Sequence, residues 1–359
     1  MGDAVAFLLG WGAGWWLLWR LPVPPPAPEA GRPAVSVVIP ARDEEASLPR
    51  LLGSLRPQLR AGDEVIVVDD HSGDATASVA RAQGATVVAA PELPSGWVGK
   101  CWACHTGATR TVNPVIAFLD ADTSVEPGGL DRLLADHSRS GGLYSVQPWH
   151  DVHRPHERLA ALFNLVALMG TGAFTPLRPR RAVGGFGPCM VTTAADYRAS
   201  GGHAGVRTMV LDDLALAARY RAAGLPVALR AGRGTIRFRM YPDGIEQVVE
   251  GFSKNFAAAA ASVRPVTVVL ISAWMAALSA PVALAVGDPA LAAACYLAVA
   301  GQLVVHLRRI GGFGWITASA YLVPLAFFLA VFARSLWLTF ARRRVTWKGR
   351  EVPSARRRS

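Results

Sequence analysis

Four long apolar segments surround a middle region in which short apolar runs alternate with polar ones. The apolar segments cover residues 4–21, 266–286, 289–307 and 315–338. Each approaches the roughly 20 residues that a helix needs to cross a bilayer. Between residues 35 and 250, short apolar runs alternate with charged, Gly-rich and Pro-rich stretches. The pattern predicts one water-soluble α/β domain between membrane helices.

The apolar runs of the middle region recur at the spacing of an α/β fold. Strands are expected at residues 35–40, 64–70, 85–89, 115–119, 141–147 and 229–239. Helices are expected between the early strands, at residues 43–57, 73–83 and 100–111. This alternation predicts a doubly wound, mostly parallel sheet. The apolar stretch 159–177 is expected to be a helix in the membrane surface or in a core, and a fifth membrane span is the alternative.

Both ends of the chain carry membrane signals. Residues 1–22 have the features of an uncleaved anchor rather than a signal peptide, because they lack a basic start and an Ala-x-Ala cleavage site. Their tryptophans are typical of a helix anchored at the membrane interface. The tail 339–359 is basic: from Arg342 onward it holds eight Lys/Arg and one Glu, which is +7 of the net charge of +11. Such a tail is expected at the cytoplasmic face, near anionic lipid.

Composition argues against several classes of protein. At 52% hydrophobic residues the chain is too apolar for an ordinary soluble enzyme. Nucleic-acid binding would need basic residues spread over a folded face with aromatics among them, which the middle region lacks, so no nucleic-acid partner is expected. Cys101, Cys104 and His105 match a haem-attachment pattern, but they open an expected helix of an α/β unit and are interpreted as packing residues. The histidines around residues 150–156 do not have the spacing of a zinc site.

Acidic residues follow three of the expected strands. Asp43 follows the first strand, Asp69 and Asp70 follow the second, and Asp120 and Asp122 follow the fourth. The carboxyl ends of strands in a doubly wound sheet meet along one crevice, where ligands bind. A turn explains one such aspartate, but three sets on successive units favour a binding site. Because no Gly-x-Gly-x-x-Gly follows the first strand, a dinucleotide cofactor is not expected.

The pair Asp120 and Asp122 has the spacing of a cation site. Residues i and i+2 of an extended chain point the same way, so both carboxylates can face one point. Hard oxygen ligands of this kind suit Mg²⁺ or Mn²⁺, with diphosphate oxygens completing the coordination shell.

The sequence resembles the family 2 glycosyltransferases, which have a GT-A fold. The motifs that carry the resemblance are Ser36–Glu45, Val67–Asp70 with Ser72, Asp74 and Thr76, Gly99–Lys100, and Asp120–Asp122. Farther along, Tyr197–His203 and Leu211–Leu214 are similar to the family's acceptor-side segment and its acidic pair. Segments at 145–150, 163–165, 186–188, 201–203, 238–241 and 347–350 are similar to the 4,4'-diaponeurosporenoate glycosyltransferases, which act on a carotenoid acid.

The resemblance implies a role for each acidic position. Asp43 and Glu45 would lie beside the nucleotide, and Asp69, with Asp70 beside it, would contact uracil or ribose. Asp122, helped by Asp120, would hold the metal on the diphosphate, with Lys100 as a nearby positive charge.

The acceptor side is implied in the same way. Asp213 matches the family's general base, with Asp212 beside it. A solvated lysine at a helix start remains the alternative for Lys100, and a helix cap remains the alternative for Asp212 and Asp213.

One departure from the family narrows the reaction. Processive members carry Gln-x-x-Arg-Trp where this chain reads Arg237-Phe238-Arg239-Met240-Tyr241. The difference argues for a single transfer rather than polymer synthesis. Arg237 and Arg239 alternate on one face of an expected strand, where they would touch phosphate or form the rim of a sheet.

These implications amount to a membrane-bound inverting glycosyltransferase that moves a sugar, with glucose expected, from a UDP-sugar to a carotenoid acid. The alternatives are transfer to a hopanoid, a glycerolipid or a polyprenyl phosphate, and a non-catalytic membrane scaffold. The expected parts are an anchor at 1–22, a GT-A domain at 35–250, membrane segments at 265–338 and a cytoplasmic tail at 339–359. A cytoplasmic domain and tail conflict with three spans between them, and Pro324 makes 315–338 the candidate for a re-entrant or interfacial segment.

Overall fold

The structure is a computed structural model that describes the chain except residues 1, 29–30, 178–183, 339–343, 348–349 and 354–359. The basic tail therefore lies mostly outside the described residues. The chain divides into two compact units. One comprises residues 22–149 and 184–239, and we call it the catalytic unit. The other comprises residues 1–21, 150–183 and 240–359, and we call it the helical unit.

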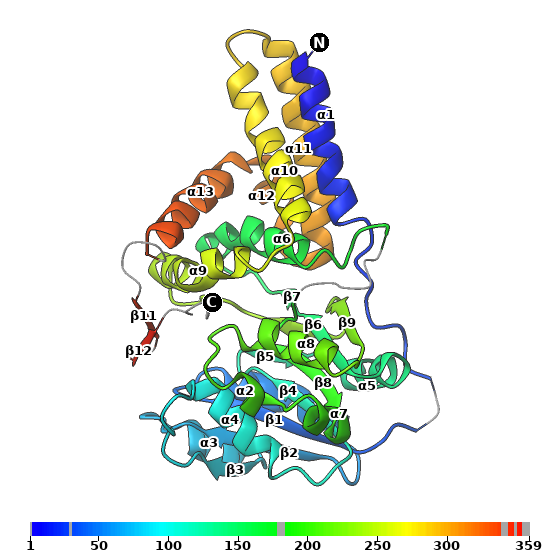
Figure 1. Cartoon of the computed structure of the whole chain (residues 1–359), viewed down its shortest axis with the longest axis vertical. Coiled ribbons are helices and arrows are strands. Elements are labelled where there is room, and N and C mark those ends of the chain that lie inside the picture. The colour runs from blue at the N-terminus through cyan, green and yellow to red at the C-terminus, as the bar shows by residue number, and fades with distance from the viewer. Residues whose placement is uncertain (1, 29–30, 178–183, 339–343, 348–349, 354–359) are drawn as a thin grey trace. The chain divides into compact units, whose positions relative to one another are not determined.

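A seven-stranded sheet in the order β3-β2-β1-β4-β8-β6-β9 forms the centre of the catalytic unit (Figure 1). The strands are β1 (Val35–Ala41), β2 (Glu64–Asp69), β3 (Thr86–Ala89), β4 (Val115–Leu119), β6 (Leu143–Gln147), β8 (Cys189–Thr193) and β9 (Val227–Ala231). Strands β1 to β4 run parallel, and β8 pairs antiparallel with both β4 and β6. The expected α/β fold with a mostly parallel sheet is confirmed.

Helices cover both faces of this sheet, because the side chains of its strands are apolar on both faces. Val37 and Ile39 of β1 pack on one face with α2 (Leu48–Leu55), α3 (Thr76–Ala82) and α5 (Gly129–Ser140). Val38 packs on the other face with α4 (Gly99–Ala108), α7 (Ala194–Ala199) and α8 (Asp212–Ala222). Short elements complete the unit: η1 (Arg56–Gln58), η3 (His203–Val206), and the antiparallel pair β5 (Thr123–Val125) and β10 (Ile236–Phe238).

Two expectations for the catalytic unit are corrected by the structure. The helix expected from residue 43 begins only at Leu48, because residues 43–47 form a hydrogen-bonded loop. The strand expected at 229–239 is two strands, β9 and β10, separated by a turn at Gly232–Thr235. The compact catalytic unit is discontinuous, with residues 22–149 and 184–239, and the expected domain range 35–250 stays a prediction.

In the helical unit, α1 (Gly2–Leu17), α10 (Pro265–Leu284) and α11 (Pro289–Ile310) lie side by side (Figure 1). Gly10 and Gly14 of α1 let this helix approach α10 closely, because a Cβ at Gly14 would lie 2.4 Å from Nε1 of Trp274. Gln302 of α11 accepts a hydrogen bond from Trp274 (2.9 Å) and donates one to the carbonyl of Trp11 (2.8 Å). These bonds satisfy polar groups within an otherwise apolar bundle.

The remaining helices of this unit are shorter. They are η2 (Pro155–Ala160), α6 (Ala161–Gly170), α9 (Ile245–Ala260), α12 (Gly314–Ser319) and α13 (Leu322–Trp337). Strand β7 (Trp149–His150) lies where the chain passes between the units, and β11 (Arg344–Trp347) pairs with β12 (Arg350–Pro353). Phenylalanine rings join three of these helices: Phe163 of α6 stacks on Phe252 of α9 at 4.0 Å and contacts Phe328 of α13 at 4.7 Å.

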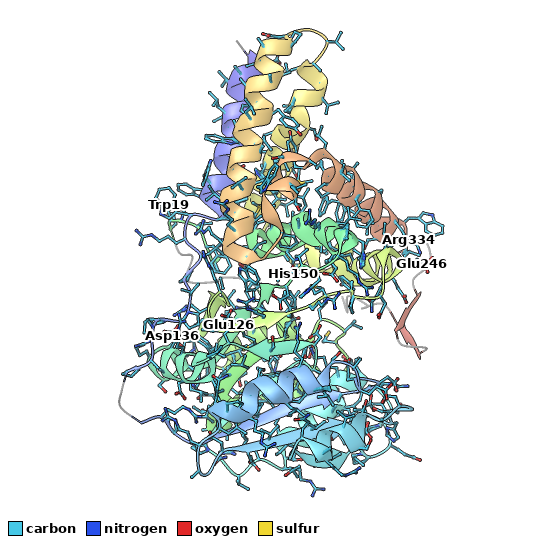
Figure 2. The ribbon with its side chains drawn as sticks, turned by 180° about the vertical axis from the view of Figure 1, so that it is seen from behind. Trp19, Glu126, Asp136, His150, Glu246 and Arg334 are labelled. Carbon is cyan, nitrogen blue, oxygen red and sulfur yellow. The ribbon has the colours of Figure 1, made fainter. Side chains whose placement is uncertain are left out.

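Among the described residues, two helices are long and apolar enough to cross a membrane, α10 and α11. Helix α1, with 16 residues, does not reach that length. The segment expected at 315–338 is not one helix, because the chain breaks between α12 and α13, and α13 has 16 residues. At the end of α1 away from the N-terminus, Trp19 projects outward and is 55% exposed (Figure 2).

Candidate active site

The predicted acidic residues gather at the carboxyl ends of β1, β2 and β4. These strands are parallel neighbours, so their carboxyl ends lie at one edge of the sheet. The amide of Asp120, directly after β4, donates to the carbonyl of Pro188 at 3.0 Å, which holds the loop before β8 beside this edge.

The loops after β1 and β2 are joined by their own side chains. Oδ1 of Asp43 accepts the amide hydrogen of Gly73 at 2.8 Å, and Oε2 of Glu45 accepts that of Ala75 at 2.8 Å. Asp43 has φ +53°, a left-handed conformation that aspartate tolerates better than most residues. The two carboxylates therefore shape the predicted nucleotide pocket, and their contact with the nucleotide stays a prediction.

The end of β2 contributes two carboxylates, the partly exposed Asp69 and the buried Asp70. Oδ1 of Asp69 accepts the amide hydrogen of Ser72 at 3.1 Å. Asp70 is buried, 3.3 Å from Nδ1 of His71 and 3.8 Å from Arg42. The structure thus brings both residues to the predicted edge, with Asp70 the less accessible of the two.

Lys100 forms an ion pair with Asp120. Its Nζ lies 2.7 Å from Oδ1 and 2.8 Å from Oδ2 of that residue. Burial alone would lower the pKa of Lys100, but Asp120 and Asp212 outweigh it and hold the pKa well above its ordinary value. Lys100 is therefore a fixed positive charge within the site and not a solvated lysine at a helix start.

Asp122 has the environment of a cation ligand. Its Oδ1 is buried and has no hydrogen-bond partner among the described residues. Burial, Asp120 and Glu44 raise the pKa of Asp122 to about 7, against the opposing effect of Lys100 and Arg50. A divalent cation would bind the unpaired oxygen and relieve this repulsion, so the residues fit the predicted metal. No group of three or more His, Cys, Asp or Glu that could hold a metal occurs in the described part of the chain, so diphosphate oxygens would complete the shell.

Asp212 and Asp213 open helix α8, where the helix dipole favours negative charge. Asp213 accepts the amide hydrogen of Leu214 through Oδ1 at 2.8 Å and that of Gly187 through Oδ2 at 3.1 Å. Leu211 and not either aspartate is the N-cap of α8, although Asp213 binds one amide of the first turn and its second oxygen is bound from outside the helix. Burial and Asp212 raise the pKa of Asp213 to about 7, which suits a group that gives and takes protons near neutral pH.

The loop before β8 is a part of the site to which sequence reasoning assigned no role. Oγ of Ser145 accepts the amide hydrogen of Phe186 at 2.6 Å and donates to its carbonyl at 3.1 Å. At Gly187 an added Cβ would lie 3.3 Å from Nζ of Lys100 and 3.6 Å from Cβ of Asp213. The loop therefore lies against both Lys100, the positive charge on the predicted donor side, and Asp213, the predicted base. The signal for it was the run Gly184-Gly185-Phe186-Gly187-Pro188.

Other candidate groups have structural roles. Arg237 pairs with Glu126 at 2.8 Å and lies over the ring of Trp149 at 4.8 Å, which favours a sheet-edge role over a phosphate contact. Cys101 and Cys104 are buried, and burial raises the pKa of both thiols, in agreement with a packing role.

Comparisons with known proteins agree with this geometry. The sequence model of glycosyl transferase family 2 matches residues 36–180. The 4,4'-diaponeurosporenoate glycosyltransferase of Staphylococcus haemolyticus (strain JCSC1435) is 38% identical over 67% of this chain and 66% of its own length, just under two thirds. The protein of the same name from Staphylococcus aureus (strain USA300) is 33% identical over 89% of this chain and 88% of its own length.

Among solved structures, a mannosyltransferase from Pyrobaculum calidifontis in complex with GDP-Man and Mn²⁺ is similar, with a TM-score of 0.54. The match covers 94% of this chain and 96% of that chain at 20% sequence identity, so it supports the fold alone. The fold likeness and the length and identity of the sequence matches lead to one assignment. The chain belongs to glycosyltransferase family 2, is related to the 4,4'-diaponeurosporenoate glycosyltransferases, and is a glycosyltransferase.

Proposed function

We propose that this enzyme transfers a sugar, with glucose expected, from a UDP-sugar to a carotenoid acid such as 4,4'-diaponeurosporenoate, with inversion at the anomeric carbon. The single observation that carries the proposal is the arrangement around Gly187. That residue lies between Lys100, which is paired with Asp120, and Asp213. The positive charge of Lys100 on the donor side and the carboxylate of Asp213 on the acceptor side are thus held beside one another. The names of the two relatives support the choice of acceptor.

On the donor side, Asp122 and Asp120 would hold Mg²⁺ or Mn²⁺. A bound divalent ion neutralises charge that develops on the departing diphosphate. Lys100 keeps Asp120 in place and adds a permanent positive charge at the same edge. Asp43, Glu45, Asp69 and Asp70 shape the loops in which the nucleotide would bind.

On the acceptor side, the attacking oxygen forms a bond to the anomeric carbon while the bond from that carbon to the diphosphate oxygen breaks. A hydroxyl must lose its proton in this step, and Asp213 is placed to take it. A carotenoid carboxylate is already ionised near neutral pH, since a carboxyl group titrates at about 4 in water. With that acceptor, Asp213 and Asp212 act mainly in positioning it.

We also propose that α10 and α11 cross the membrane, that α1 is anchored in it beside α10, and that α13 lies in its surface. Helix α13 exposes Val323, Leu329 and Trp337 although its opposite face packs on α6 and α9. Two spans after the catalytic residues return the chain to the side that it left. With two spans, the basic tail and the catalytic unit would lie on the same, cytoplasmic side, in agreement with the positive-inside rule.

The test is transfer by the purified full-length chain in nanodiscs, supplied with UDP-glucose, Mn²⁺ and a carotenoid acid. We expect a glucosyl ester, and Asp122→Ala should lower its rate by about 100-fold or more, since loss of a metal ligand removes charge stabilisation. Asp243→Ala is the matched control, because Asp243 is exposed and exchanges two hydrogen bonds with the Gln247 side chain.

Parallel reactions offer a hopanoid, a glycerolipid and a polyprenyl phosphate as acceptors. Faster transfer to any of them than to the carotenoid acid would overturn the acceptor assignment. An Asp122→Ala variant as active as wild type would overturn the assigned site.

A further inference from the structure

A buried histidine lies behind the acidic pair. His203, the first residue of η3, has no solvent exposure, and Asp212 is 6% exposed. Nε2 of His203 and Oδ2 of Asp212 are 3.9 Å apart. Both atoms are buried, and neither has a hydrogen-bond partner in the part of the chain that the structure describes. Two unpaired polar atoms that face each other in a buried site are unusual, because each costs free energy when left alone.

Two contacts together favour one protonation state of the His203 ring. The Tyr197 hydroxyl accepts the backbone amide hydrogen of His203 at 3.1 Å and lies 2.9 Å from Nδ1. We infer that the hydroxyl donates to Nδ1, because a proton on Nδ1 would leave the lone pair of Nε2 facing the carboxylate of Asp212. The ring proton then resides on Nε2, the nitrogen that faces Asp212.

The ring is neutral at physiological pH. Burial, Lys100 and His105 lower the pKa of His203 to about 3. A neutral imidazole can donate a hydrogen bond to a carboxylate without bringing a charge into the site. The ring also packs edge-on against Phe118, with centroids 4.9 Å apart, so its orientation is restricted.

Given the function proposed above, we propose that His203 is a positioning residue whose Nε2–H holds the carboxylate of Asp212. This contact would fix the negative charge of Asp212 beside Asp213. At 3.9 Å the contact is longer than a hydrogen bond. Hydrogen bonds of this kind often tighten only when substrate binds, so a shift of about 1 Å would complete it.

The other groups around His203 and Asp212 already have hydrogen-bond or ion-pair partners, or are weak donors. Lys100 is already bound to Asp120, and Asp213 is held by the amides of Gly187 and Leu214. Of the other titratable groups near the pair in the described part of the chain, Tyr197 and His105 act on His203, and the buried thiols of Cys101 and Cys104 on α4 are protonated and weak donors. Of these groups, the imidazole is the one whose unpaired nitrogen faces Oδ2 of Asp212.

Kinetics of matched variants test this role. His203→Phe keeps the ring but removes the donor, and we expect kcat to fall about tenfold while the KM for the UDP-sugar stays within twofold. His203→Gln places an amide donor at a similar reach and should restore kcat to within about threefold of wild type. His137→Phe is the control, since His137 is a buried histidine of α5 in the same unit. Equal kcat values for the His203→Phe and His137→Phe proteins would overturn the proposal.

A second readout does not depend on catalysis. In ¹⁵N-histidine-labelled full-length protein without substrate, NMR should show His203 as the neutral tautomer protonated at Nε2, and Asp212→Asn should shift that Nε2–H resonance. An Nδ1-protonated ring would overturn the proposal even if the enzyme is active. Absence of transfer to every acceptor, with the expected tautomer, would instead overturn the proposed function and leave the positioning of Asp212 supported.

Discussion

The surroundings of Asp213 determine how transfer should depend on pH. Its pKa is raised to about 7 by burial and by Asp212, so the carboxylate holds a proton below that pH. A raised pKa means that the basic form predominates only above about pH 7. The consequence depends on whether the acceptor itself must lose a proton.

We predict opposite pH behaviour for two kinds of acceptor. With a hydroxyl acceptor, kcat should rise about tenfold per pH unit below pH 7 and level off above it, because the base must be ionised. With a carotenoid acid, this rise should be absent between pH 6 and 8, because the acceptor is already ionised. Initial rates at saturating UDP-sugar would show the difference. A rise through pH 7 with the acid acceptor would mean that Asp213 acts as a required base for it too.

At the scale of elements, the loop from Gly184 to Pro188 is the piece that joins the two halves of the site. Gly187→Ala introduces a Cβ at 3.3 Å from Nζ of Lys100, which must push the lysine or the loop aside. We predict a loss of kcat of about tenfold or more, since small displacements of a positioned group are costly. The melting temperature should change by only a few degrees.

Gly53→Ala is the control for this variant. Gly53 lies within α2, an added Cβ there meets nothing within 4 Å, and the residue should gain up to about 1 kcal/mol of helix stability. Similar losses of activity in both variants would show that the loop has no special place in the site.

The contact between α1 and α10 offers a second comparison within one helix. An added Cβ would meet Nε1 of Trp274 at 2.4 Å from Gly14, but nothing within 4 Å from Gly12. We predict that Gly14→Ala lowers the melting temperature in detergent by several degrees, because overpacking costs about 1–3 kcal/mol. Gly12→Ala should not lower it, and the better helix propensity of alanine should raise it slightly. Equal melting temperatures for both variants would contradict the packing of α1 on α10.

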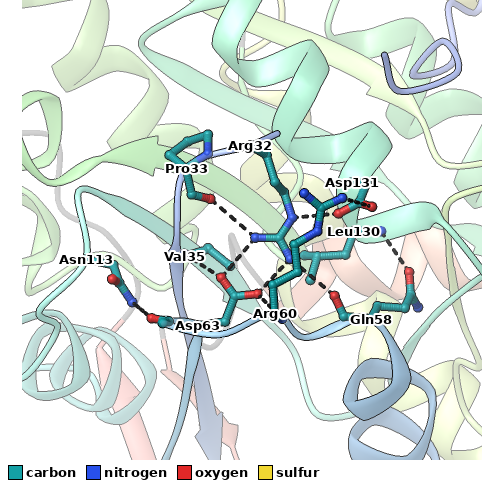
Figure 3. Close-up of polar contacts among 10 residues, drawn as sticks. Arg32, Pro33, Val35, Gln58, Arg60, Asp63, Asn113, Leu130 and Asp131 are labelled. Atoms are coloured by element: carbon teal, nitrogen blue, oxygen red, sulfur yellow. Dashed lines mark hydrogen bonds and ion pairs between the residues drawn. The ribbon is translucent and has the colours of Figure 1, made fainter. Parts of the chain in front are cut away.

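At the scale of the whole molecule, Arg32 ties the start of the catalytic unit to the rest of that unit (Figure 3). Its guanidinium donates to both oxygens of Asp63 at 2.9 and 2.7 Å, and to Asp131 at 2.6 Å. The side chains of Arg32 and Asp63 are 5% and 0% exposed. Arg132 additionally donates to the carbonyls of Pro24 and Pro25. These contacts hold the Pro-rich segment along the unit.

Arg32→Met should destabilise the protein by about 3–5 kcal/mol, because it leaves the Asp63 carboxylate buried without its cation. Arg60→Met, which removes a partly exposed pair with Asp131, should cost about 0–1 kcal/mol. Urea unfolding of both variants measures the difference. Equal midpoints would show that burial of the Arg32 pair does not matter.

The Arg32 effect should also depend on pH. Burial opposes ionisation of Asp63, but Arg32 and the amides of Arg60 and Val35 outweigh it and lower the pKa of the carboxyl group. A carboxyl group whose pKa is lowered in the folded state stabilises the protein fully at a pH above its unfolded-state pKa. This stabilisation is lost as the pH falls through the folded-state pKa. The difference in free energy of unfolding between wild type and Arg32→Met should therefore become smaller in acid.

Local pattern determined much of this protein. The early strands, the helix at Gly99–Ala108 and the placement of acids at strand ends follow from apolar runs and from the two-residue period of a strand. The same local pattern made 315–338, through Pro324, the candidate for a re-entrant or interfacial segment, and in the structure the helix is interrupted between Ser319 and Leu322.

Tertiary structure decided what depends on contacts between distant residues. Strand β8 has a mixed sequence, Cys-Met-Val-Thr-Thr, and became a central strand only by pairing with β4 and β6. The contact of Gly187 with Asp213, and the approach of His203 to Asp212, join residues whose spacing along the chain carries no periodic signal. Burial then raised the pKa of Asp122 and Asp213, an effect of removal from water that no sequence position specifies by itself.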